Sequence, residues 1–316
     1  MRKVIKCYLI LSALFVPSLS HGQTKDKLFN QLTKATEVKS EAIIEKKKQD
    51  LLNKTSSIAV NKSKNYLETL FPTVEVSLEL KENTKPTGGV LVVSPLSDPK
   101  NVESTTFTQG SIFLKDDRET VNLGLGQRFL KLDQKLLLGG NIFYDHEFPY
   151  DHQRVGIGIE MRTSVGEINA NSYKAITKWK NGADSSEERA LAGRDIEASI
   201  PLPYINWSKA SVRHFKWDGV DGASDLKGND YSLSATILSF SIEAGLRDFQ
   251  NQQEDEYFVK IFWRPMLNND NQKFTKLVSE QAYALTSMEN KRYEKVKREN
   301  LIVKQKRRTG INLVAY

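Results

Sequence analysis

The feature that most constrains this chain is a strict two-residue alternation of side-chain character. In the stretch QRVGIGIEMRTSV, which starts at Gln153, apolar residues occupy every second position, and glycine or charged residues lie between them. A period of two is typical of a β-strand with one apolar and one polar face, because successive side chains point to opposite sides. One such strand fits many folds, so the number of repeats decides between them.

Similar segments recur about twelve times between residues 73 and 265, beginning with TVEVSLEL and ending with EYFVKIFWRP. Most have roughly 8–14 residues, enough for a tilted strand to cross the hydrocarbon layer of a membrane. The mean hydropathy is nevertheless only −0.48. A membrane barrel explains both facts, because only its lipid-facing side chains must be apolar while the others line a wet lumen. The pattern therefore predicts an all-β membrane protein, and a secreted soluble β-barrel or sandwich remains the alternative.

The connections between these segments alternate in length. KLDQK, SVGE and LSFS are tight, whereas DHEFPYDHQ, WKNGADSSEER, WDGVDGASDLKGND and QNQQEDE are longer and polar. Short turns on one side and long loops on the other are typical of outer-membrane barrels. SPLSDPKNVEST is the exception, a long connection on the short side.

The N-terminal region differs from the alternating middle. Residues 1–22 combine a basic start, an apolar run and a small-residue exit, as secretory signal peptides do. Cys7, the only cysteine, lies in this segment, so the exported protein would have no disulfide. Residues 23–72 are rich in helix formers and predict a helical segment that ends before Pro72.

The C-terminal region, residues 266–316, is basic. It carries 11 Lys and Arg but only 5 Asp and Glu, whereas residues 61–265 are net acidic. The overall charge of +7 therefore does not indicate nucleic-acid binding, and no nucleic-acid partner is predicted. The stretch NQKFTKLVSEQAYALTSMENKRYEKVKREN, residues 271–300, has the composition of a helix, and a short tail follows it.

Four segments, in order along the chain, resemble the β-domain of the intimin and invasin family, the inverse autotransporters of Gram-negative bacteria. They are FTQGSIFLKDDRETVNLGLGQRF, GGNIFYDHEFPYDHQRVGIGIEM, ERALAGRDIEASIPLP and KRYEKVKRENLIVKQK. The resemblance implies a twelve-stranded antiparallel transmembrane β-barrel, formed by residues 73–265, in the bacterial outer membrane. It also implies a periplasmic N-terminus with residues 23–72 as a periplasmic helical segment. Residues 266–316 would then be a linker threaded through the pore and a short tail with an extracellular C-terminus.

The family linker matches KRYEKVKRENLIVKQK, so the resemblance places residues 292–306 inside the pore. Acidic residues on the predicted inward faces support this placement, because ion pairs are stronger in a low-dielectric tube than on a surface. A solvated helix face is the alternative interpretation of the basic residues. The predicted pore-linker residues are Arg292, Tyr293, Lys295, Lys297, Arg298, Asn300 and Ile302. The predicted lumen-facing acids are Glu75, Glu79, Asp145, Glu160, Asp195 and Glu197.

The stretch YDHEFPYDHQR is the densest cluster of groups that could carry chemistry. It contains Asp145, His146, Glu147, Asp151 and His152, residue types that occur in metal and acid–base sites. The spacing matches no standard metal motif, so an extracellular turn is favoured over a metal site or a hydrolase that uses His146 or His152. The sequence thus predicts no enzyme activity, catalytic residue, metal or cofactor.

The combined prediction is an outer-membrane translocator or anchor, and the resemblance implies a role in surface display and cell adhesion. The chain continues only about ten residues past the linker, so the passenger of the larger relatives is expected to be missing. The expected partners are outer-membrane lipid and the barrel-assembly machinery, with peptidoglycan or a separately encoded surface passenger as further candidates. A pore or structural barrel without cargo is the alternative, and a barrel hydrolase is a third interpretation.

Overall fold

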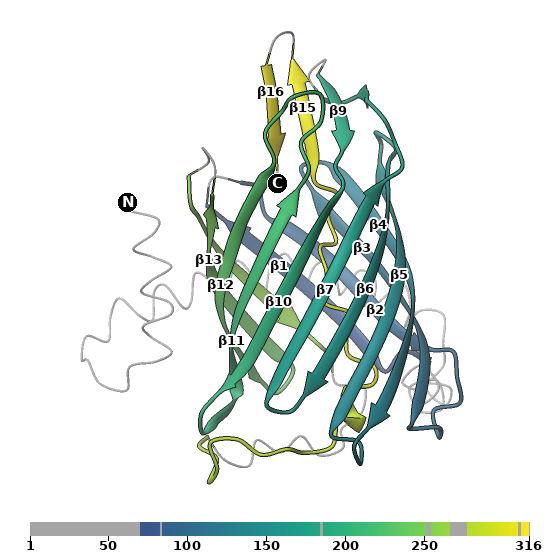
Figure 1. The fold of residues 1–316 in the computed structure, drawn as a ribbon, viewed down its shortest axis with the longest axis vertical. Coiled ribbons are helices and arrows are strands. Elements are labelled where there is room, and N and C mark those ends of the chain that lie inside the picture. Colours follow the sequence, from purple (N-terminus) through teal and green to yellow (C-terminus); the bar gives the residue numbers. More distant parts are fainter. Residues whose placement is uncertain are drawn as a thin grey trace, which may run out of the picture. The chain divides into compact units, whose positions relative to one another are not determined.

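The chain closes into an antiparallel barrel in a computed structural model (Figure 1). The structure describes residues 70–82, 84–183, 186–250, 254–265, 277–308 and 311–315. These residues all belong to one compact unit, Leu70–Tyr316. The predicted signal peptide lies outside the described residues, and so does the predicted helical segment apart from residues 70–72. Within the described ranges, no helix is both long enough and apolar enough to span a membrane.

Twelve strands form the barrel, in the order β1-β14-β13-β12-β11-β10-β7-β6-β5-β4-β3-β2. Pairing of β1 with β14 closes the sheet, so no barrel strand is left with an unpaired edge. The predicted twelve-stranded antiparallel barrel is confirmed. Its strands are β1 (Thr73–Lys81), β2 (Thr87–Pro95), β3 (Ser104–Lys115), β4 (Arg118–Lys131), β5 (Leu136–Phe148), β6 (His152–Thr163), β7 (Gly166–Ala175), β10 (Gly193–Leu202), β11 (Ile205–Trp217), β12 (Leu226–Ile237), β13 (Phe240–Phe249) and β14 (Glu256–Trp263).

The two-residue alternation separates a lipid face from a lumen face. On β6, Ile157 and Ile159 are 60% and 68% exposed, while Glu160 and Arg162 are buried inside the barrel. The same inversion, with apolar side chains out and charged side chains in, runs along β4 and β5. Exposure of a continuous belt of isoleucine and leucine is unfavourable in water but favourable in lipid. The outer face is therefore the membrane-facing surface.

The barrel ends differ in the connections that they carry. One end has the tight connections 132–135, 164–165, 203–204 and 238–239, together with the longer 96–103, which is the exception noted in the sequence. The other end has the longer insertion 176–192 and loop 218–225, but also the short turns 116–117 and 149–151. WKNGADSSEER and WDGVDGASDLKGND lie in these longer connections, as predicted. The prediction of a long loop at DHEFPYDHQ is wrong, because these residues form the ends of β5 and β6 around the three-residue turn 149–151.

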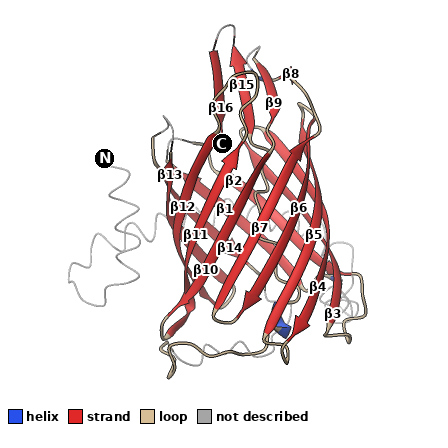
Figure 2. Cartoon of the chain, viewed as in Figure 1, coloured by secondary structure: helices blue, strands red, loops and turns tan. Residues whose placement is uncertain are grey.

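A second, small sheet lies at the long-loop end (Figure 2). The insertion between β7 and β10 contains β8 (Lys180–Asn181) and β9 (Glu187–Ala190), which are not barrel strands. They pair with β15 (Lys304–Arg308) and β16 (Ile311–Ala315) in the order β16-β15-β9-β8. The alternating pattern gave no indication of this sheet, because its strands are short and come from distant parts of the chain.

The helix predicted for residues 271–300 is wrong over its described part. Within residues 277–303 the only helical turn is η2 (Glu289–Lys291), a single 3₁₀ turn, and the rest has no regular secondary structure. The segment does not form a helix because side chains of the barrel wall donate hydrogen bonds to its backbone carbonyls.

Candidate functional site

The C-terminal part of the chain crosses the inside of the barrel from one end to the other. At the short-turn end, the backbone N–H of Met288 donates to the carbonyl of Gln134, in the β4–β5 turn, at 2.8 Å. At the long-loop end, Leu191 N–H donates to the carbonyl of Val303 at 3.0 Å. Figure 1 shows this segment as a yellow trace within the barrel. We call residues 288–303 the luminal segment.

Side chains of the barrel wall bind the backbone of the luminal segment. Arg128 donates to the carbonyls of Arg292 and Glu294 at 2.7 and 2.6 Å. A helix would satisfy such carbonyls with its own N–H groups, four residues further on. Here the wall satisfies them, so the extended conformation costs no hydrogen bonds despite the helical composition. The further donors to luminal carbonyls are Thr73, Asn122, Arg154, Arg162 and Asn171.

Three of the predicted linker residues form ion pairs with acids of the wall. Lys295 Nζ lies 2.5 Å from Glu75 Oε1, and Lys297 Nζ lies 2.7 Å from Glu197 Oε1. Arg298 donates to both carboxylate oxygens of Asp145. Buried ion pairs of this kind are retained only with good geometry, because each charge has lost its hydration.

Arg298 and Asp145 form the most buried of these pairs. The two terminal nitrogens of Arg298 donate to the two carboxylate oxygens of Asp145, at 2.8 and 2.7 Å. Arg154 of β6 donates to the same carboxylate at 2.8 Å, and Asn122 of β4 does so at 2.8 Å. The Arg298 guanidinium also stacks 4.1 Å above the ring of Phe143. This set of contacts joins the luminal segment to three strands.

The other predicted linker residues contact the wall without an ion pair to it. Arg292 donates to the carbonyls of Pro99 and Asn101 at 3.3 Å, in the β2–β3 loop. Tyr293 packs against the cluster Leu91, Val93, Phe107, Phe143 and Val296. Asn300 accepts a hydrogen bond from Asn122 through its carbonyl, and Ile302 is buried.

The remaining predicted acids face the lumen but bond to wall residues. Glu79 lies 3.7 Å from Lys81. Glu160 binds Arg128 and Arg162, each at 2.5 Å. Asp195 accepts from Asn171 and Tyr173 at 2.8 Å. Glu160 and Asp195 thus act on the luminal segment only indirectly, by holding the side chains that contact it.

Buried arginines of the wall are the functional residues that the sequence analysis missed. Arg128, Arg154 and Arg162 are at most 1% exposed and each donates to a luminal carbonyl. The signal was present, because all three occupy inward positions of the same alternation that identified the acids. The lumen therefore has mixed charge, with acids that bind cationic side chains and arginines that bind the backbone.

Glycine and aromatic residues provide the surface on which Arg128 lies. Gly126 has no side chain, and a Cβ there would lie 2.2 Å from the ring of Phe107. Phe107 fills this space, and the Arg128 guanidinium stacks 4.4 Å from its ring. Such a cation–π contact holds the guanidinium in position for the luminal carbonyls.

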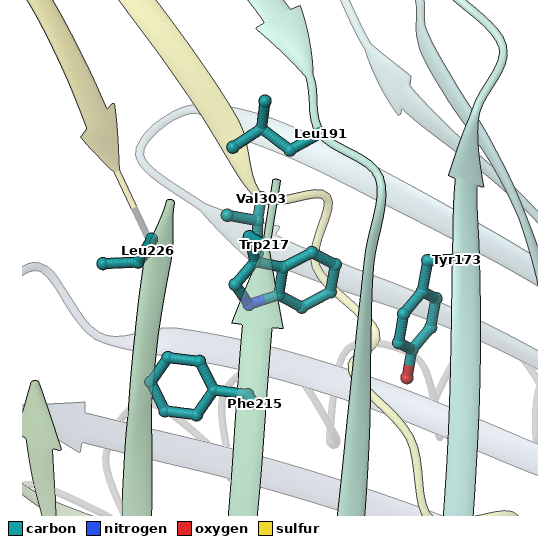
Figure 3. Packing of buried hydrophobic residues seen from close by; sticks show 6 residues of the cluster. All are labelled: Tyr173, Leu191, Phe215, Trp217, Leu226 and Val303. Carbon is teal, nitrogen blue, oxygen red and sulfur yellow. The ribbon is translucent and has the colours of Figure 1, made fainter. Parts of the chain in front are cut away.

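Apolar packing closes the long-loop end of the lumen. Val303 of the luminal segment is buried with Tyr173, Leu191, Phe215, Trp217 and Leu226 (Figure 3). These residues come from β7, β11, β12 and the β9–β10 connection. The cluster surrounds the chain at the point where it leaves the barrel.

The luminal segment does not fill the barrel. A cavity of about 830 Å³ remains beside it, and its lining includes Glu243, Lys260 and Arg264. Charged walls of this kind hold water rather than empty space. The lumen thus contains both the luminal segment and a cavity lined by charged side chains.

The candidate chemical cluster YDHEFPYDHQR does not come together as one site. Asp145 binds Arg154 and Arg298 inside the barrel, whereas His146 stacks on Phe148 at 4.1 Å between ring centroids. Adjacent strand residues point to opposite faces, so Asp145 and His146 are separated by the barrel wall.

His152 instead joins a buried group that includes an acid from β9. Ligand atoms of Glu147, His152 and Glu188 lie within 4.8 Å of one another, a donor set that could suit a divalent metal. Arg118 already binds Glu147 at 2.7 Å and Glu188 at 2.8 Å. Lys304 also pairs with Glu147. A dication would have to enter beside these positive groups, so the geometry favours an ionic cross-link over a metal site.

Glu188 keeps its charge in this group. Burial raises the pKa of Glu188, but the contacts of its carboxylate with His152 and Arg118 lower it more, so the pKa lies well below its ordinary value of 4.5. The carboxylate is therefore available for ion pairs at neutral and mildly acidic pH.

Comparisons with known proteins agree with this geometry. A family model described as inverse autotransporter, beta-domain matches residues 25–300. Invasin of Yersinia enterocolitica is 28% identical over 138 residues, which are 42% of this chain and 16% of that protein. The inverse autotransporter adhesin YeeJ of Escherichia coli K12 is 26% identical over 216 residues, 64% of this chain and 9% of that protein. A putative attaching and effacing protein homolog of the same strain is 32% identical over 137 residues, 42% of this chain and 46% of that protein.

This chain thus spans less than half the length of these curated relatives. Among solved structures, one from a study of the in-meso crystallization of membrane proteins has a TM-score of 0.59. It is 22% identical and covers 74% of this chain and 100% of its own chain, a likeness that shows the barrel fold. The resemblance noted in the sequence is confirmed: the chain is a bacterial outer-membrane β-barrel and belongs to the inverse autotransporter β-domain family.

Proposed function

We propose that this chain is an outer-membrane anchor that holds its own C-terminal segment at the cell surface. The observation that supports the proposal is the luminal segment, which enters at the short-turn end, bonds to the wall throughout its length and leaves at the long-loop end. Long loops of outer-membrane barrels face the outside, and short turns face the periplasm. The C-terminus is then extracellular and the N-terminus periplasmic.

The parts of the chain have corresponding roles in this proposal. Residues 1–22 are a signal peptide, 23–72 a periplasmic helical segment, 73–265 the barrel, and 266–316 the linker with its tail. The pore-linker residues and the lumen-facing acids together plug the pore and fix the linker. Assembly requires lipid and the barrel-assembly machinery. Peptidoglycan is a candidate partner for residues 23–58.

The names of the relatives suggest what such an anchor would display. Relatives carry the printed names invasin, intimin and adhesin. We therefore propose surface display in the service of cell adhesion, with the passenger encoded separately or attached beyond Tyr316. The family is one of adhesins and translocators rather than enzymes, and neither His146 nor His152 lies in an arrangement that supports the hydrolase interpretation.

The topology can be tested with an epitope tag placed directly after Tyr316. We expect protease added to intact cells to remove the tag, because the C-terminus lies on the long-loop side. A tag placed between residues 24 and 30 should survive on intact cells and disappear only after the outer membrane is permeabilised. Survival of the C-terminal tag, with loss of the N-terminal one, would reverse the orientation and contradict the proposal.

A further inference from the structure

We propose that the outer loops form a binding site for the strand that leaves the barrel, and that this site sets the register of the chain in the pore. The site, which we call the exit clamp, consists of β9, Glu147 on β5 and Val220 in the β11–β12 loop. Its ligand is residues 304–307 of this chain, an extended segment with lysines at alternate positions. The inference deepens the proposed function, because it says where the anchored chain comes to rest.

Backbone pairing provides the first element of the clamp. β15 runs antiparallel to β9, with Lys304 opposite Ala190 and Lys306 opposite Glu188. β9 belongs to the insertion between two barrel strands and does not pair within the barrel sheet. Its free edge therefore accepts the departing chain as an added strand, a mode that contributes affinity through main-chain hydrogen bonds.

Two acids provide the second element, on one face of β15. Lys304 pairs with Glu147, and Lys306 Nζ lies 3.2 Å from Glu188 Oε1. Arg118 binds both acids at 2.7 and 2.8 Å and so fixes their separation. Both carboxylates are almost fully buried. The pair of acids is thus a rigid receptor for two lysines that are two residues apart.

The opposite face of β15 provides the third element. Gln305 is fully buried, and its amide makes two hydrogen bonds with the backbone of Val220. Val220 N–H donates to Gln305 Oε1 at 2.9 Å, and Gln305 Nε2 donates to Val220 O at 3.0 Å. Arg307 follows on this face, 2.6 Å from Glu187 and stacked 4.3 Å over Trp179.

These elements together admit one register. A shift by one residue turns both lysines away from the acids, because side chains alternate along a strand. A shift by two places Val303 or Arg307 opposite Val220, and neither side chain can both donate to and accept from its backbone as Gln305 does. Fixing residues 304–307 also fixes Lys297 and Arg298 opposite their acids in the lumen.

The register can be measured with cysteine pairs in the full chain, because its single cysteine, Cys7, lies in the proposed signal peptide. With Arg307→Cys as the common partner, we expect Glu187→Cys to form a disulfide, since residues 187 and 307 are paired. Arg189→Cys, two residues along the same face of β9, is the matched control and should not form one. Equal cross-linking of the two pairs would overturn the proposed register.

The receptor can be tested by trypsin digestion of the purified, folded protein in detergent, followed by mass spectrometry. In the native chain, the bonds after Lys304 and Lys306 should be protected. Glu188→Gln removes a buried anion that pairs with Arg118 and Lys306. We therefore expect cleavage after Lys304 and Lys306 to be at least about tenfold faster. Glu119→Gln, at an exposed acid of β4, is the control and should cleave at the native rate.

A fold defect must be separated from loss of the clamp. Heat-modifiable migration in gels reports whether the barrel of each variant is closed, and Glu147→Gln provides a second variant if Glu188→Gln does not fold. Native-rate cleavage in a folded variant of either acid would overturn the proposal. Since these measurements use purified protein, they are independent of membrane orientation, so their failure and the failure of the tag experiment are distinguishable.

Discussion

Deletion of residues 290–316 should convert a nearly closed barrel into an open pore. In planar bilayers we expect the single-channel conductance to rise at least about tenfold, because a protein strand with its side chains occupies the bore of a twelve-stranded barrel. The intact chain should still show a small conductance, because a wet cavity of about 830 Å³ lies beside the luminal segment. The expected change is therefore from a small current to a large one.

The truncated barrel should still fold, because its acids do not all lose their partners. Glu75 keeps Arg264 at 2.9 Å, and Asp145 keeps Arg154 at 2.8 Å. Water that enters the emptied lumen hydrates the remaining charges, so they are no longer buried in the sense that makes lone charges costly.

The control for the conductance experiment is a shorter deletion. Removing residues 309–316 takes away β16 and leaves the luminal segment and β15, so the conductance should stay at the intact level. Equal conductance of the intact chain and the 290–316 deletion would show that the luminal segment does not obstruct the pore.

The barrel was predictable because its signal is local and repeated. Each strand carries the two-residue alternation in its own sequence, and residues such as Ile157, Ile159 and Glu160 lie on the faces that this alternation predicts. The apolar side is the outer one because it faces lipid. The faces of the strands could therefore be predicted without knowing which distant residues contact each other.

The conformation of the luminal segment was harder to predict, because it depends on partners far away in sequence. Its lysines and glutamates favour helix when considered alone, yet Arg128 and Arg162 bind its carbonyls from more than a hundred residues away. Tertiary contacts override helix propensity in such cases. The pairing of β15 with β9 has the same origin, since four residues of β9 carry too little pattern to reveal a strand.

Neutralising Asp145 should destabilise the barrel more than removing any one of its partners. The carboxylate is fully buried and balances two guanidinium groups, those of Arg154 and Arg298, which are themselves at most 1% exposed. Asp145→Asn keeps the shape of the side chain but leaves two buried positive charges without an anion. Breaking a buried ion pair from one side typically costs about 3–5 kcal/mol, and we expect a loss of that size here.

Arg298→Met tests this reasoning from the other side. It removes one cation and its contact with Phe143 but leaves Asp145 paired with Arg154, so the loss should be smaller, about 1–2 kcal/mol. The double variant Asp145→Asn/Arg298→Met retains only one uncompensated guanidinium, and so should be more stable than Asp145→Asn alone. The midpoint temperature of the heat-modifiable gel shift ranks the variants. Additive losses would mean that these charges act independently, whereas rescue by Arg298→Met shows that Asp145 serves as the shared counter-ion that joins the linker to the wall.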